Sequence, residues 1–288
     1  MCYLRVTLID VGWGDSILIE STSGIGRPRF ALIDSNDNAE REYWPTRNFL
    51  RKHFGSREDE FDYTEIDPLF DFVMVSHDHS DHGTGLKRIM SQYGTQKFWY
   101  PKTDPEHSPV IAHLQSYANH HMVDIDNQAV DREIDIGNLG DTALDVLWPP
   151  PDHYLQDSNK NNNSIVLLLT LENQSILLTG DAEGEVWSEI SDQVPLNTVA
   201  VKVPHHGSRN GILSHGGTTL LNRLSQTAGN IHMGISCHPN FPNRYDLPHP
   251  DVVNSISEDP YHLYRTDLHY HITFTVRDSQ VVVRYSHE

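Results

Sequence analysis

The sequence predicts a mixed α/β (α+β) fold in which two β-sheets pack face to face and helices cover their outer sides. Two observations support this prediction. Short β-rich runs alternate with segments of helical periodicity, and the two halves of the 288 residues repeat the same strand-rich and then helical rhythm. No linker, short-period repeat or low-complexity tract separates the halves. We therefore expect residues 1–288 to form a single domain with a large buried core.

The first half begins with strands. "LRVTLIDV" (4–11) and "DSILIE" (15–20) alternate in polarity across "GWG", which predicts a hairpin. "RFALID" (29–34) predicts a third strand, and "WPTRNFLRKHF" (44–54) a helix. The charged segment that follows, 55–67, is expected to be a loop.

The next elements are predicted from hydrophobic periodicity. "DFVMV" (71–75) is typical of a buried strand, and the apolar positions 86, 89, 90 and 93 predict one face of a helix. Further predicted elements are a strand at 97–101, a helix at 109–121 and a strand that starts at 142 and ends at a run of prolines.

In the second half, "SIVLLLTL" (164–171) and "QSILLTGD" (174–181) predict another hairpin, followed by a short helix over 182–190. "TVAVKV" (198–203) predicts a strand that leads into a histidine-rich loop. A strand at 230–237 and a hairpin over 269–286 complete the pattern.

The composition narrows the possible partners and compartments. The chain has 21 Lys+Arg and 40 Asp+Glu, a formal net charge of −19, which disfavours broad electrostatic wrapping of a nucleic acid. Bound metal ions could still attract an anion locally. Its two cysteines form no disulfide framework, and no apolar run is long enough to cross a bilayer. The amino terminus does not resemble a signal peptide, so we expect a cytoplasmic protein without a membrane partner.

The segment "SHDHSDHG" (76–83) carries the strongest chemical signal. Three histidines and two aspartates follow a buried strand, so several donor atoms can converge on one loop. Imidazole nitrogen and carboxylate oxygen are the ligands that zinc takes besides thiolate. A pair of ions would need further donors from other strand ends.

Two later strand ends offer such donors. "LLTGD" ends at Asp181, which could bridge two ions or simply cap a helix. "VKVPHHGS" contains His205 and His206. Adjacent side chains on a strand point to opposite faces, so one of the two is expected to be a ligand, unless the loop relaxes this rule.

Taken together, these motifs resemble the metallo-β-lactamase superfamily. "HDHSDH" matches its HxHxDH signature, and "DVGWGD", "NNNSIVLLL", "LLTGD" and "VKVPHHGS" occur in the order of its ComEC-type branch. The resemblance implies an αββα four-layer sandwich with two divalent metal ions, zinc or alternatively manganese. It also implies which residues surround the ions: His77 and His79 on the first, Asp81, His82 and His206 on the second, Asp181 bridging both, and Asp34 behind them.

The same resemblance implies roles near the ions. Asp81, His205 and His249 are candidates for direct participation in catalysis, with Asp81 orienting a metal-bound hydroxide and accepting its proton. Asparagine, serine and arginine side chains are candidates for contact with substrate, namely Asn163, Ser208, Arg209 and Asn243.

Two departures from the superfamily pattern stand out. Many members supply a third histidine to the first ion from the loop that here reads "NKNNNS" (159–164). We expect Asn163, water or another histidine such as His153 to complete that site, and loose ligation would favour manganese over zinc. Trp13 replaces a polar residue of the branch, where it could stack on a substrate ring or simply pack.

We therefore predict a metal-dependent hydrolase that acts on a phosphodiester, such as a nucleotide or single-stranded nucleic acid. The alternatives are a hydrolase of lactone, thioester or other carboxylic esters, and a metal-bound partner module without catalytic activity. The sequence indicates no particular partner protein.

Overall fold

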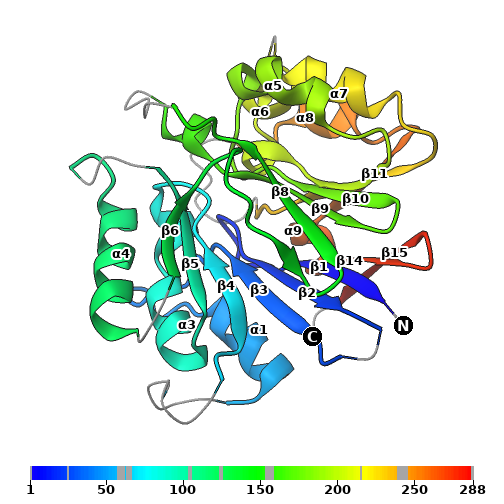
Figure 1. Ribbon diagram of the computed structural model, residues 1–288. Coiled ribbons are helices and arrows are strands. Elements are labelled where there is room, and N and C mark those ends of the chain that lie inside the picture. Colours follow the sequence, from blue (N-terminus) through cyan, green and yellow to red (C-terminus); the bar gives the residue numbers. More distant parts are fainter. Residues whose placement is uncertain are drawn as a thin grey trace.

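The computed structural model describes residues 2–24, 26–56, 62, 67–102, 106–122, 126–152, 159–214, 216–238 and 246–286. Its two large sheets face each other, with a helical layer on the outer side of each (Figure 1). The predicted αββα four-layer fold is therefore confirmed.

The first sheet has eight strands in the order β15-β14-β1-β2-β3-β4-β5-β6. β3 to β6 run parallel, so the segments that follow β3 and β4 leave the same edge of the sheet. The strands span Tyr3–Leu8 (β1), Ile17–Thr22 (β2), Arg29–Ile33 (β3), Phe70–Met74 (β4), Lys97–Pro101 (β5), Asp126–Val130 (β6), His271–Arg277 (β14) and Gln280–Ser286 (β15).

The second sheet has seven strands in the order β13-β12-β11-β10-β9-β8-β7. Here β10 to β13 run parallel, which again places the ends of neighbouring strands at one edge. The strands span Asn138–Leu139 (β7), Thr142–Trp148 (β8), Val166–Leu171 (β9), Gln174–Leu178 (β10), Thr198–Lys202 (β11), Ile231–Ile235 (β12) and Tyr261–Arg265 (β13).

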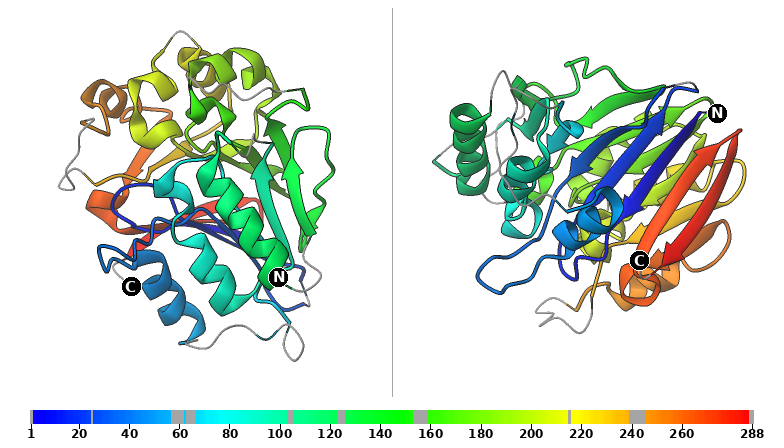
Figure 2. Two further views of the ribbon diagram at one scale, coloured as in Figure 1. Left: turned by 90° about the vertical axis from the view of Figure 1, so that its left-hand side faces the viewer. Right: turned by 90° about the horizontal axis from the view of Figure 1, so that it is seen from below.

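Helices form the outer layers. α1 (Pro45–Phe54), α3 (Leu86–Tyr93) and α4 (Pro109–His121) lie on the first sheet, whereas α5 (Gly184–Ile190), α7 (Gly217–Leu224) and α8 (Pro250–Ser255) lie on the second (Figure 2). Short helical segments occupy loops: α2 (Ser80–Gly83), α6 (Arg209–Ile212), α9 (Thr266–His269), and the 3-10 turns η1 (Lys160–Asn163), η2 (Ser191–Gln193) and η3 (Pro204–Gly207).

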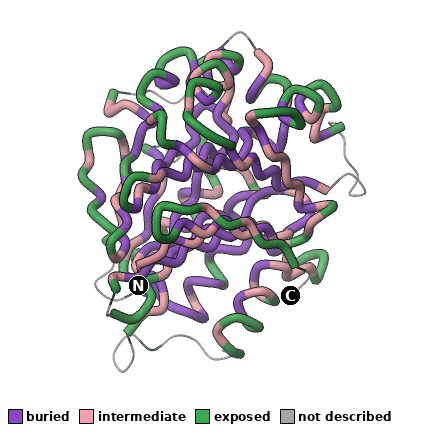
Figure 3. Tube along the Cα trace, turned by 90° about the vertical axis from the view of Figure 1, so that its right-hand side faces the viewer, coloured by how far each residue is buried: buried purple, intermediate pink, exposed green. Residues whose placement is uncertain are grey.

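Three apolar cores hold these layers together. The central core lies between the sheets and includes Val6, Leu167 and Phe274, while each helical layer buries its own apolar stripe against a sheet. Trp187 on α5 and Tyr93 on α3 are among the largest fully buried side chains. Buried segments accordingly concentrate in the strands between the helices (Figure 3).

The predicted elements are found with small shifts of their ends. Helices 86–93 and 109–121 have the expected bounds, and the hairpins β1–β2, β9–β10 and β14–β15 all form. The predicted loop over 55–67 falls largely outside the described residues. No helix within the described ranges is both long and apolar enough to cross a membrane.

Candidate metal centre

Side chains from both sheets meet where the parallel strands end. Asp34 follows β3, and the segment from Ser76 to His82 follows β4 and enters the short helix α2. Gly14 allows close approach here, because a Cβ on it would lie 2.1 Å from the Asp81 backbone oxygen. Its φ of 91° also favours glycine.

Asp181 arrives from the second sheet, three residues after β10 ends at Leu178. Gly180 precedes it with φ of 50°, and a Cβ there would lie 2.8 Å from the Ser164 side chain. The Asp181 backbone N–H donates to Ser164 Oγ at 3.0 Å. The "TGD" turn is therefore fixed by a tight contact with the asparagine-rich loop.

His205 and His206 lie beyond β11 in the turn η3, and both have left-handed backbones with φ of 47° and 51°. Non-glycine residues adopt this conformation rarely and at a cost in free energy. The alternation expected along a strand does not apply to them. Their side chains instead approach the same carboxylate.

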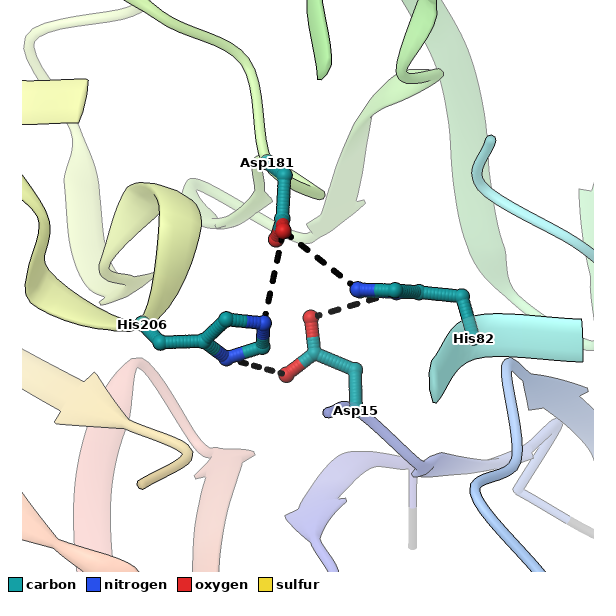
Figure 4. Close-up of side chains that lie close together, drawn as sticks. All are labelled: Asp15, His82, Asp181 and His206. Atoms are coloured by element: carbon teal, nitrogen blue, oxygen red, sulfur yellow. Dashed lines mark ion pairs between the residues drawn. The ribbon is translucent and has the colours of Figure 1, made fainter. Parts of the chain in front are cut away.

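Asp181 Oδ2 is the point on which four histidines converge. The Nε2 atoms of His206 and His82 lie 3.3 Å and 3.4 Å from it, and those of His77 and His205 lie 3.9 Å and 4.0 Å away. Figure 4 shows His82 and His206 pointing toward Asp181 from opposite sides. The structure thus brings together residues that are 129 positions apart in the sequence, from His77 to His206.

The outer ring nitrogens of His82 and His206 are already engaged. His82 Nδ1 lies 2.7 Å from Asp34 Oδ2, and His206 Nδ1 lies 3.0 Å from the Ser236 carbonyl oxygen. Because both partners are acceptors, each Nδ1 carries a proton, so that a metal ion that displaces the Nε2 proton would find the Nε2 lone pair available. Both Nε2 atoms are buried and form no hydrogen bond.

This geometry fits a metal ion. Two donors that each lie about 2.0–2.1 Å from a tetrahedral zinc ion are separated by roughly 3.4 Å. The 3.3 Å and 3.4 Å separations between Asp181 Oδ2 and the two Nε2 atoms agree with that spacing. The donor set of imidazole nitrogen and carboxylate oxygen is also the one that zinc and similar ions take.

The first histidine pair also borders Asp181, and the His77 ring lies beside the His82 ring, with 4.2 Å between their centroids. His77 Nε2 is 2.9 Å from His79 Nδ1, and the His77 ring is fully buried. Burial lowers the pKa of His77 well below its ordinary value, with a further contribution from neighbouring His82. A neutral imidazole is the form that binds metal.

Two buried charges that the sequence did not lead us to expect lie behind the cluster. Lys202 Nζ is 2.5 Å from Asp15 Oδ2 and 3.3 Å from Asp181 Oδ1, and its side chain is wholly buried. Asp15 lies 3.8 Å and 3.9 Å from the Nδ1 atoms of His82 and His206, and Figure 4 shows its carboxylate between the two rings and below Asp181. One ligand atom from each of these four side chains lies within 4.8 Å of the others, so Asp15 also belongs to the group that could hold an ion. Two features of the sequence could have revealed the two buried charges. Asp15 is the last residue of "DVGWGD", and Lys202 is a lysine inside a mostly apolar strand.

The electrostatics of the cluster follow from these contacts. Burial opposes charge, but Asp181 and Asp34 raise the pKa of His82 well above its ordinary value. His206, His82 and Lys202 outweigh burial and hold the pKa of Asp181 well below its usual range. A cation at the Nε2 positions would therefore compete with protons for the same lone pairs.

The other predicted site residues lie at varying distances from this centre. Asp81 Oδ2 is 4.0 Å from His82 Nε2, at the partly exposed rim. His249 caps α8 through its Nδ1, and its backbone N–H donates to Gly207 O at 3.0 Å, next to the His205–His206 turn. Trp13 packs against the His206 ring, with 5.4 Å between ring centroids.

Ser208 and Arg209 make their contacts away from the cluster. Ser208 Oγ accepts from Asn210 N, and Arg209 pairs with Asp251 at 2.5 Å on the surface. Asn163 is buried at the end of η1. Asn243 and His153 lie outside the described residues.

Comparison with known proteins supports the fold. No family model matches the sequence. ComE operon protein 3 of Bacillus subtilis (strain 168) is 25% identical over 272 residues, which cover 91% of this chain and 32% of that protein. The chain therefore spans about a third of the length of this relative.

Solved structures with the same architecture cover nearly the whole chain. The metallo-β-lactamase fold protein YhfI of Bacillus subtilis matches 92% of this chain and 96% of its own length, with 15% identity and a TM-score of 0.52. Zn²⁺-bound PqqB of Methylobacterium extorquens matches 91% of this chain and 97% of its own length, with 10% identity and a TM-score of 0.54. The chain has the metallo-β-lactamase fold.

Proposed function

We propose that the protein is a hydrolase that uses two divalent metal ions to cleave a phosphodiester. One observation carries the metal assignment. His82 and His206 present buried Nε2 atoms without hydrogen bonds toward Asp181 Oδ2, at separations that match two ligands of one ion. A solvated polar loop would not leave such atoms buried and unsatisfied.

The residues around Asp181 divide into two groups. His77 and His79 form one, and Asp81, His82 and His206 form the other, with Asp181 between them. Asp34 holds the His82 ring, as carboxylates behind metal-binding histidines commonly do. Asp15 and Lys202 belong to this supporting layer, because Asp15 faces the Nδ1 side of the rings.

Zinc is the preferred ion, and manganese the alternative. The histidine-rich donor set favours zinc, and PqqB, which has the same fold, was solved with bound Zn²⁺. When bound, such a pair of ions would supply Lewis acidity and lower the pKa of water.

The chain's own residues would position the reacting groups. Asp81 lies at the accessible rim, so its carboxylate can accept a proton from an attacking water. Lys202 neutralises Asp15 and Asp181 Oδ1 from below, which leaves Asp181 Oδ2 directed toward the histidines. Asp34 keeps the proton of His82 on Nδ1.

The phosphodiester assignment rests on the ComEC-type motifs and on charge. Two cations offer a local attraction for a phosphate, although the chain as a whole carries a formal charge of −19. This acidity favours a nucleotide or a short single strand over a long duplex, which would require a basic track.

Hydrolysis assays on protein that has been stripped of metal and then reconstituted with zinc or manganese test the proposal. The substrates are bis(p-nitrophenyl) phosphate and a labelled single-stranded oligonucleotide, with a lactone and a thioester as competing classes. We expect phosphodiester cleavage that disappears on chelation and falls by at least about 100-fold in Asp81→Ala.

His262→Ala is the matched control, because His262 lies on β13 and stacks on His232, away from the cluster contacts described above. Turnover of the lactone or thioester alone would replace the proposed substrate class. Full activity after chelation would contradict the metal dependence.

A further inference from the structure

We propose that His205 completes the first metal site together with His77 and His79, and that Glu183 orients it. This inference deepens the proposed function and rests on it in requiring two ions. It assigns a ligand to the position for which the asparagine-rich loop supplies no histidine.

The backbone of the turn directs both histidines to one place. His205 and His206 have consecutive left-handed conformations, which residues other than glycine adopt rarely and under strain. The turn is held by His205 N–H donating to Gly180 O at 3.3 Å and by Ser208 N–H donating to His205 O at 2.8 Å. Such strain at a histidine pair beside Asp181 is typical of a functional site.

The His205 ring is oriented as a ligand would be. Its Nδ1 lies 2.9 Å from Glu183 Oε1, so the carboxylate accepts the Nδ1 proton and leaves a lone pair on Nε2. Nε2 then lies 4.0 Å from Asp181 Oδ2, nearly the same distance as His77 Nε2 at 3.9 Å. Both separations exceed the roughly 3.4 Å expected between two ligands of a tetrahedral zinc ion, so the two rings would have to move toward Asp181 by about half an ångström to bind one ion with it.

The asparagine-rich loop explains how Glu183 is held. Asn159 Nδ2 donates to Glu183 Oε2 at 2.9 Å, and Asn161 Nδ2 donates to Oε1 at 3.0 Å. The Glu183 backbone N–H donates to Asn162 Oδ1 at 3.0 Å. Asn159 and Asn161 thus hold the carboxylate behind His205, and Asn162 holds the Glu183 backbone.

The number of bound ions shows whether His205 is a metal ligand or only a substrate contact, because only loss of a ligand would release an ion. Wild-type protein is stripped with a chelator, reconstituted with zinc, and analysed for ions per chain by mass spectrometry and for affinity by calorimetry. We expect two ions in the wild type and one in His205→Ala. Glu183→Gln should keep both ions but bind one of them about 10- to 100-fold more weakly.

His262→Ala serves as the matched control and should retain two ions at wild-type affinity. Asn163→Ala tests the competing ligand, and on the present proposal it should also retain two ions. Circular dichroism verifies that each variant is folded, and Glu183→Gln provides the test if His205→Ala does not fold. Wild-type affinity for both ions in either His205→Ala or Glu183→Gln would overturn the proposal, as would loss of an ion in Asn163→Ala instead.

Because the measurement is of ions and not of turnover, it is independent of the substrate. A protein that binds two ions through His205 but cleaves no phosphodiester would support this inference and refute the proposed function. If the protein cleaves a phosphodiester and His205→Ala still binds both ions at wild-type affinity, the proposed function would be supported and this inference refuted.

Discussion

Lys202 and Asp15 form an ion pair with 2.5 Å between Nζ and Oδ2, and both side chains are almost completely inaccessible to solvent. Lys202 Nζ also donates to the Gly180 carbonyl oxygen at 2.7 Å. This ammonium therefore connects the "DVGWGD" loop of the first sheet with the "TGD" turn of the second. It is a permanent cation beneath the carboxylate on which the histidines converge.

We expect Lys202→Met to destabilise the protein by about 3–5 kcal/mol, because it leaves Asp15 and Asp181 buried without their cation. Urea unfolding in the presence of a chelator measures the effect. The double variant Lys202→Met with Asp15→Asn should recover part of the loss. Arg209→Met removes an exposed ion pair and should change the unfolding free energy by less than about 1 kcal/mol. If Lys202→Met and Arg209→Met lowered the unfolding free energy equally, burial would not explain the contribution of Lys202.

Asp34→Asn should weaken metal binding about 10- to 100-fold. Asp34 accepts from Ser76 N, Ser76 Oγ and His82 Nδ1, and an amide NH₂ would confront one of these donors with another donor. Calorimetric titration with zinc compares the variant with Asp145→Asn, which replaces an exposed aspartate on β8. Unchanged affinity in Asp34→Asn would show that His82 needs no carboxylate behind it.

Asp37 should make stability depend on pH in a defined direction. The carboxylate accepts from the Thr46 and Arg47 backbone N–H groups at the start of α1, and burial raises its pKa from 3.8 to about 6. Since the folded pKa exceeds the unfolded one, its contribution to stability is complete below about pH 3.8 and is lost as the pH rises through about 6.

Asp37→Asn removes this titration. The unfolding free energy of the variant relative to wild type should therefore rise by about 2–3 kcal/mol between pH 4 and pH 7. Chemical denaturation of both proteins at each pH provides the measurement. A relative stability that stays constant with pH would mean that the carboxyl titrates normally.

The two thiols should react at very different rates. Cys237 is buried, and burial together with the adjacent Asp267 raises the pKa of its thiol, whereas Cys2 is partly exposed. Thiolate is the reactive form, so a disulfide reagent at pH 8 should label Cys2 rapidly and Cys237 only after denaturation. Cys2→Ser should abolish the rapid phase, and its persistence would contradict the assignment.

Much of the fold could be predicted because its elements have regular apolar periodicity. α3 and the hairpin β14–β15 are examples in which a stripe or an alternation marks the buried side. β6, "DNQAV", was not predicted, because an edge strand with one buried residue has no such pattern. β13 was missed for a related reason, since four of its five residues are only partly buried.

The segment after β4 could be identified as a candidate metal site from its residue types, but its surroundings could not be predicted. Lys202 and Asp15 act through contacts between the two sheets, which no local pattern reveals. The orientation of His205 depends on two left-handed residues, whereas strand alternation suggested that only one histidine of the pair could be a ligand. The placement of these three side chains is determined by tertiary contacts and not by the local sequence.

The pairing of β14 with β1 has a consequence for the order of folding. Leu8 lies opposite Ile272, so the first sheet joins residues more than 260 positions apart. In the same region the Asp10 backbone N–H donates to His271 Nδ1 at 3.0 Å, at the entrance to the loop that carries Asp15. During synthesis this loop must wait for His271 to emerge before it acquires its final support. Long-range closure of this kind slows folding, and the candidate metal centre would be among the last parts of the described fold to mature.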